Sequence, residues 1–228
     1  MVRINFEEEL AKAESALIAQ GELVKRQLAR VLEALENQDV DIAAQVIDND
    51  DRVDDIYLDT QTRVLNVLAL QAPVAGDLRL VSAILHSNMH FERMGDLCVN
   101  IAKFVQNRMP YPANSPMMRR LNDMGARASE MLSLALQAFS ERSAALAEEL
   151  PVKDDVLDRL NRGMLEDLKG YAGDEESFEW AINLILVARY LERFGDHTVD
   201  VGEQISFLVT GVFREFTDAS HPQQAEAN

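Results

Sequence analysis

The chain has 228 residues, of which 47% are hydrophobic and 27% charged, and its 39 acidic against 22 basic residues give a formal net charge of −17 at pH 7. This length is sufficient to bury a sizeable core. The acidic excess argues against a nucleic-acid partner and against an anionic membrane surface, and no run of about eighteen apolar residues is present that could insert directly into a membrane.

The rest of the composition is typical of a helical cytoplasmic protein. Gly and Pro are scarce, with 10 and 6 residues, and Ala, Leu, Glu and Gln are abundant. One cysteine, Cys98, excludes an intramolecular disulfide, and the N-terminal sequence lacks the apolar core of a signal peptide. We therefore expect an all-α protein in the cytoplasm, reaching the inner membrane only through partners.

The first half of the chain is expected to form three long helices. Apolar residues recur at three-and-four spacing from Leu10 to Leu35, which predicts an amphipathic helix over 5–36. Asp39 can cap a second helix that runs to about residue 70, where Pro73 and Gly76 end it. The third extends from residues 74–77 to residue 108. Short connections between them indicate an antiparallel bundle over residues 1–108.

A proline-rich segment separates this half from a second one. Residues 109–116, MPYPANSP, hold three of the six prolines, so they cannot be helical throughout and are expected to form a linker. Helical periodicity then resumes over 117–139, 143–171 and 175–212. The prediction is two tandem three-helix bundles, 1–108 and 117–216, made of six long antiparallel helices and followed by a disordered tail over 217–228.

An internal repeat supports this division. The pentapeptide ERMGD at 92–96 returns as ERFGD at 192–196, an offset of 100 residues, and residues 39–56 align with 143–160 at an offset of 104. The two halves therefore read as copies of one three-helix unit.

Each pentapeptide places carboxylates on an apolar face. Residues at i, i+4 and i+8 of a helix project to one side, and the triplets Glu92, Asp96, Asn100 and Glu192, Asp196, Asp200 continue buried stripes. The preceding helix of each half supplies an acidic pair, which is Asp50 and Asp54 in the first and Asp154 and Asp158 in the second. About four converging carboxylates form a hard, oxygen-rich cation site.

An ion-pair network could neutralise the same charges without metal. Arg93 and Arg193 follow the glutamate in both copies, and both readings remain open at this level. Gly95 and Gly195 are unfavourable in mid-helix by about 1 kcal/mol each, so we expect them to permit close approach at the clusters.

The histidines are assigned to surface or core positions. His86 and His90 have the spacing of metal ligands, but they lie about 120° or more around the helix from Glu92 and Asp96. His197 is expected to point away from the cluster of its neighbour Asp196.

Taken together, the motifs resemble the PhoU family, accessory regulators of bacterial phosphate uptake and phosphate-starvation signalling. The resemblance covers nearly the whole chain and rests on LALQAPVAGDLRLV at 68–81, ERMGDLCVNIA at 92–102 and the second copy, ERFGD. It implies paired three-helix bundles, frequently dimeric, whose carboxylate motifs can bind metal ions, including multinuclear iron or zinc clusters in some members. By position it places the metal ligands at Asp50, Asp54, Glu92, Asp96, Asn100, Asp154, Asp158, Glu192, Asp196 and Asp200.

The resemblance also implies a role without catalysis. Members of the family contact the phosphate ABC transporter and the membrane-bound sensor histidine kinase, so that the kinase stays off when phosphate is ample. Iron or zinc is the expected metal, with Mg, Mn, Ca or Ni as alternatives, and a homodimer is the expected assembly. Two other readings remain, a metal-loaded enzyme or storage protein and a purely structural scaffold. The chain has no Glu-x-x-His pair and no phosphate-binding glycine loop to support an enzyme.

Two residues depart from the family pattern. Asp200 stands where the first copy has Asn100, which adds a carboxylate to the second cluster. Pro151 lies in the fifth predicted helix, opposite Ile47 of the first copy, and is expected to delay or kink that helix.

Overall fold

A computed structural model describes residues 2–107 and 115–216, with side chains from residue 6 onward. It contains only helices in these ranges, and the elements in chain order are α1 (Val2–Asn37), α2 (Val40–Asp48), α3 (Asp51–Gln71), α4 (Ala75–Gln106), α5 (Pro116–Glu141), α6 (Ala144–Ala147), α7 (Leu150–Leu168), a 3₁₀ turn η1 (Lys169–Tyr171) and α8 (Glu175–Thr210). The all-α prediction is therefore confirmed.

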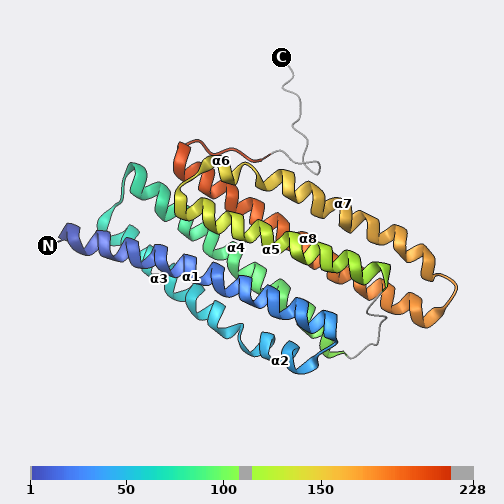
Figure 1. Ribbon diagram of the computed structural model, residues 1–228. Coiled ribbons are helices and arrows are strands. Elements are labelled where there is room, and N and C mark those ends of the chain that lie inside the picture. The colour runs from blue at the N-terminus through green and yellow to red at the C-terminus, as the bar shows by residue number, and fades with distance from the viewer. Residues whose placement is uncertain (1, 108–114, 217–228) are drawn as a thin grey trace, which may run out of the picture.

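The helices lie side by side along one common direction, and successive long segments run antiparallel (Figure 1). Helices α1, α4, α5 and α8 form the centre, since α4 packs on both α1 and α8 and α5 packs on both α8 and α1. The segment α2–α3 covers α1 and α4, and α6–α7 covers α5 and α8 in the same way. The two halves that repeat in the sequence therefore also pack in the same way. The last helix of the first half, α4, packs against the last helix of the second half, α8.

The second helix of each half is broken, where the sequence predicted one continuous helix. In the first half the break falls at Asn49 and Asp50, and the Asn49 side-chain amide donates to the Gln45 carbonyl at 2.6 Å. Asn and Asp side chains compete for backbone groups in this way and weaken a helix locally. In the second half Pro151 lies in the first turn of α7, so it delays that helix and does not kink its interior.

The central residue of each pentapeptide belongs to the core. Met94 and Phe194 are 0% and 1% exposed, whereas the arginines beside them are exposed. The buried Met94 and Phe194 and the exposed arginines before them set the rotation of each helix about its axis. In this orientation the carboxylates of each pentapeptide lie at the edge of the core.

The predicted connecting segments are only partly described. Ser115 caps α5 by accepting a hydrogen bond from Met118 N at 3.1 Å, and Pro116 occupies the first turn. The predicted linker 109–116 lies outside the described residues except for these two, and so does the predicted tail 217–228.

Candidate metal centre

The carboxylates of the second half converge as the sequence pattern predicts. Asp154 and Asp158 of α7 and Asp196 of α8 each offer an oxygen, and these oxygens lie within 4.8 Å of one another. Asp154 and Asp158 are 2% and 7% exposed, while Asp196 lies at the rim of the cluster, where part of its side chain is exposed to solvent. Three carboxylates at this spacing, two of them buried, form a suitable set of ligands for a hard divalent cation.

Glu192 lies at the buried edge of this cluster. Its Oε1 pairs with the Arg189 guanidinium, and its Oε2 is buried without a hydrogen-bond partner within the described part of the chain. Burial raises the pKa of Glu192 to about 7, and the negative charge of Asp196 adds to this increase against the opposing effect of Arg189. Burial also raises the pKa of Asp196, with Asp158 contributing. The second half therefore concentrates negative charge in a poorly solvated place, which favours a bound cation.

The cluster of the first half is looser. Among the described residues, no three carboxylates there reach the spacing found in the second half. Asp50 Oδ1 accepts a hydrogen bond from Gln27 Nε2 of α1 at 3.0 Å, and burial raises the pKa of Asp50, Asp54 and Glu92. Gln27 Oε1 is buried without a partner in the ranges described, so this cluster has a neutral oxygen that could join a cation site.

Arginines neutralise part of the charge, but not in the pattern that the sequence indicated. Arg93 contacts both Glu92 Oε2 at 3.4 Å and Asp96 Oδ2 at 3.3 Å. In the second half Arg189 pairs with Glu192, whereas the sequence offered Arg193 as one candidate for neutralising the cluster. The i, i+3 spacing of Arg189 and Glu192 was a usable signal in the sequence, because residues three apart are neighbours on a helix.

Glycines let the helices approach at both clusters, as predicted. A Cβ added at Gly195 would lie 2.5 Å from Asp154 Oδ1 and 2.5 Å from Leu157 Cδ2. At Gly95 it would lie 3.0 Å from Asp50 Oδ1, which is less severe. The glycine of each pentapeptide therefore leaves space for the acidic pair of the preceding helix.

We expect Gly195→Ala to lower the free energy of unfolding by about 1–2 kcal/mol. The overpacking against buried Asp154 and Leu157 outweighs the gain in helix propensity that alanine brings. Urea denaturation would measure it, with Gly173→Ala as the control, because a Cβ there has nothing within 4 Å. A Gly195→Ala protein at least as stable as the wild type would contradict this account of the pentapeptide.

One of the predicted ligands, Asp200, lies apart from the converging oxygens of the second half. In the first half the equivalent residue, Asn100, is half-buried one turn beyond Asp96 on α4. Asp200 groups with His90 and His197 and not with Asp154, Asp158 and Asp196. Neither histidine was predicted as a ligand, because helical periodicity cannot show that α4 and α8 bring His90 and His197 together.

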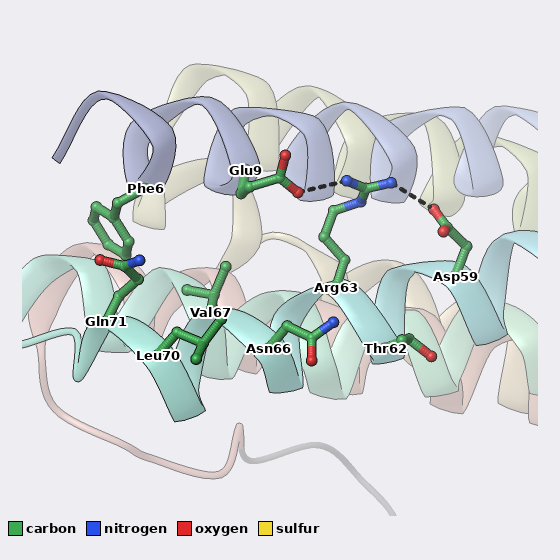
Figure 2. A pocket seen from close by; sticks show the side chains of 9 residues that line it. All are labelled: Phe6, Glu9, Asp59, Thr62, Arg63, Asn66, Val67, Leu70 and Gln71. Carbon is green, nitrogen blue, oxygen red and sulfur yellow. Dashed lines mark hydrogen bonds and ion pairs between the residues drawn. The ribbon is translucent and has the colours of Figure 1, made fainter. Parts of the chain in front are cut away.

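A separate groove of about 190 Å³ lies between the start of α1 and the end of α3 (Figure 2). Arg63 of α3 bridges Glu9 of α1 and Asp59, with N–O distances of 2.6 and 3.2 Å. The guanidinium of Arg63 is already paired with these two carboxylates, so we interpret the Arg63 ion pairs as a structural link between α1 and α3.

These observations define a class of protein, an all-helical chain of two repeated three-helix units, each with a carboxylate cluster at the contact between its second and third helices. The PhoU domain model matches residues 17–105 and 121–205, one match in each half. The chain belongs to the PhoU family, a family of accessory and regulatory proteins and not of enzymes. The prediction that it has no catalytic role is thereby confirmed.

Individual relatives agree over nearly the whole length. The phosphate-specific transport system accessory protein PhoU homolog of Clostridium acetobutylicum is 32% identical, and the match covers 92% of this chain and 97% of that protein. The crystal structure of PhoU from Pseudomonas aeruginosa is similar with a TM-score of 0.84 and 30% identity, over 91% of this chain and all of that one. The phosphate transport system regulatory protein PhoU from Streptococcus pneumoniae gives a TM-score of 0.83 at 29% identity, over 92% of this chain and 99% of that one.

Within the described ranges, no helix combines the length and the apolar character needed to cross a bilayer.

Proposed function

We propose that this protein is a cytoplasmic accessory regulator of phosphate uptake that represses phosphate-starvation signalling when phosphate is ample. It acts as an adaptor between the phosphate ABC transporter and a sensor histidine kinase. The observation that carries the proposal is the family match over both halves, together with relatives whose names are those of phosphate transport accessory and regulatory proteins. A homodimer that associates peripherally with the membrane through these partners is part of the proposal.

The carboxylate clusters are proposed to bind metal. Asp154, Asp158 and Asp196, with Glu192 beside them, would hold an ion in the second half, and Asp50, Asp54, Glu92 and Asp96 would hold one in the first. Iron or zinc is the proposed ion, with Mg, Mn, Ca or Ni as alternatives. The buried, unpartnered oxygens Glu192 Oε2 and Gln27 Oε1 support this, because a buried acceptor without a donor is costly unless a cation or water satisfies it. A bound ion would supply positive charge that holds the acidic helices together.

The adaptor role is tested by capture and by a reporter of phosphate-regulated expression. Tagged full-length protein should retain the transporter and the kinase from detergent-solubilised membranes, and its deletion should switch the reporter on in phosphate-rich medium. Light scattering of the purified protein tests the dimer. Failure to capture either partner, with the reporter unchanged in the deletion strain, would overturn the adaptor proposal.

Protein purified without chelator is expected to contain metal, and chelation should lower its melting temperature because the carboxylates then repel one another. Elemental analysis and thermal unfolding before and after chelation measure this. A protein that contains no divalent or transition metal even after reconstitution would contradict the metal proposal, while leaving the adaptor role to its own test.

A further inference from the structure

Three potential metal ligands converge where the two halves meet. His90 comes from α4, and His197 and Asp200 come from α8. The two Nδ1 atoms are 3.2 Å apart, and Asp200 Oδ2 lies 3.4 Å from the Nδ1 atom of His90 and 3.5 Å from that of His197. The three side chains are partly buried, with exposed fractions of 13%, 20% and 44% in the same order. They form a closed triangle of donor atoms.

The size of this triangle matches one face of a tetrahedral zinc site. Zinc bonds to His nitrogen and carboxylate oxygen of about 2.0–2.1 Å, at tetrahedral angles, place the ligand atoms about 3.3–3.4 Å apart. An octahedral centre with similar bonds would require about 2.9–3.0 Å between neighbouring ligands. We propose that His90, His197 and Asp200 bind a Zn²⁺ ion that links the two halves of the protein.

The chemistry of the three groups suits zinc. Imidazole nitrogen and carboxylate oxygen are both common ligands of Zn²⁺ in proteins. Without metal, the facing Nδ1 atoms of His90 and His197 can form one hydrogen bond, in which one nitrogen donates a proton and the other accepts it. A metal ion between them would instead be bound by the lone pairs of both nitrogens. The Asp200 carboxylate balances half of the charge of the ion.

All three ligands lie where the two repeats differ. At the offset of 100 residues, His90 corresponds to Tyr190, His197 to Leu97 and Asp200 to Asn100. The positions in the other half that correspond to these three residues therefore lack the His pair, and within the described ranges this group of ligands occurs once. A role as a zinc ligand would explain why position 200 is Asp, whereas the corresponding position 100 is Asn, without placing Asp200 in the carboxylate cluster.

The ion has a path from solvent. His197 and Asp200 also line a cavity of about 520 Å³ that α8 forms with residues 215–216. Because its ligands come from α4 and α8, bound zinc would fasten the contact between the two halves. The three zinc ligands are different residues from the converging carboxylates of α7 and α8, although Asp196 lines the same cavity.

The test is a zinc titration of the full-length, chelator-treated protein by calorimetry. We expect both His197→Ala and Asp200→Asn to lose one zinc equivalent per chain, or to bind it at least about tenfold more weakly. Co²⁺ in this site should show the intense visible absorption of a tetrahedral centre, and both variants should lose it. Far-UV circular dichroism checks folding, and Asp200→Asn, which exchanges one oxygen for nitrogen, serves if His197→Ala does not fold.

Two controls separate this site from the rest of the protein. His86→Ala removes an exposed histidine one turn earlier on α4 and should keep the equivalent, and Asp154→Asn with Asp158→Asn should also keep it. Unchanged zinc stoichiometry and affinity in His197→Ala would overturn the proposal. A tetrahedral Co²⁺ spectrum that disappears only in the double Asp→Asn variant would overturn it too, because the ion would then belong to the carboxylate cluster.

Discussion

Asp154→Asn combined with Asp158→Asn is expected to weaken metal binding in the second half by more than about 100-fold. Mutations of residues that only support ligands typically cost about 10–100-fold, and this variant removes two of the three converging carboxylates. Competition with a chromogenic chelator measures the loss, and elemental analysis gives the number of ions that remain.

The matched control is Asp50→Asn with Asp54→Asn, the equivalent pair of the first half. We expect it to lose less affinity, because its carboxylates are more widely spaced. In the absence of metal, the Asp154→Asn, Asp158→Asn variant should be at least as stable as the metal-free wild type, since it relieves repulsion between carboxylates. Equal metal affinity in the variant and the wild type would show that these aspartates are not ligands.

Glu192→Gln is expected to stabilise the metal-free protein by about 2 kcal/mol more at pH 8 than at pH 5. The pKa of Glu192 rises from an ordinary 4.5 to about 7 on folding. The folded state therefore binds the proton more tightly, so the contribution of Glu192 to stability is fully present below pH 4.5 and is lost as the pH rises toward 7. Gln cannot ionise and does not incur that loss.

Urea denaturation across this pH range, with chelator present, makes the measurement. Glu179→Gln, on the exposed face of the same helix, is the control for the Glu-to-Gln exchange itself. With added metal the wild type should instead be more stable than Glu192→Gln at pH 8, because a cation beside Glu192 stabilises its ionised form. A Glu192→Gln protein whose stability parallels that of the wild type at every pH would contradict the buried-carboxylate account.

The sequence was most informative where a property belongs to one helix. Spacing predicted the bounds of α1, α4, α5 and α8 within a few residues, and repetition of the pentapeptide paired the two halves. Gly95 and Gly195 indicated close approach before any contact was known, and the structure places Asp50 and Asp154 against them. These features are local, because a helix fixes which of its own residues share a face.

Features that depend on contacts between helices were predicted less well. Asp200 was assigned to the second carboxylate cluster from its place in the repeat, but its carboxylate lies with two histidines. Arg189, and not Arg193, pairs with Glu192, although the i, i+3 spacing of this pair within α8 could have indicated it from the sequence. The break before α3 reflects local competition for backbone groups that apolar periodicity does not record, whereas Pro151 indicated from the sequence that α7 starts late.

By itself the sequence determined the helices, the two repeats, the family and the four acidic segments that form the clusters, because each follows from the identity and spacing of neighbouring residues. Only the tertiary structure decided which groups meet across helices: a tight trio of carboxylates in the second half, a looser set in the first, and a His–His–Asp triangle between α4 and α8. The physical reason is that periodicity fixes the face of a helix on which a side chain lies, whereas packing decides what that face contacts.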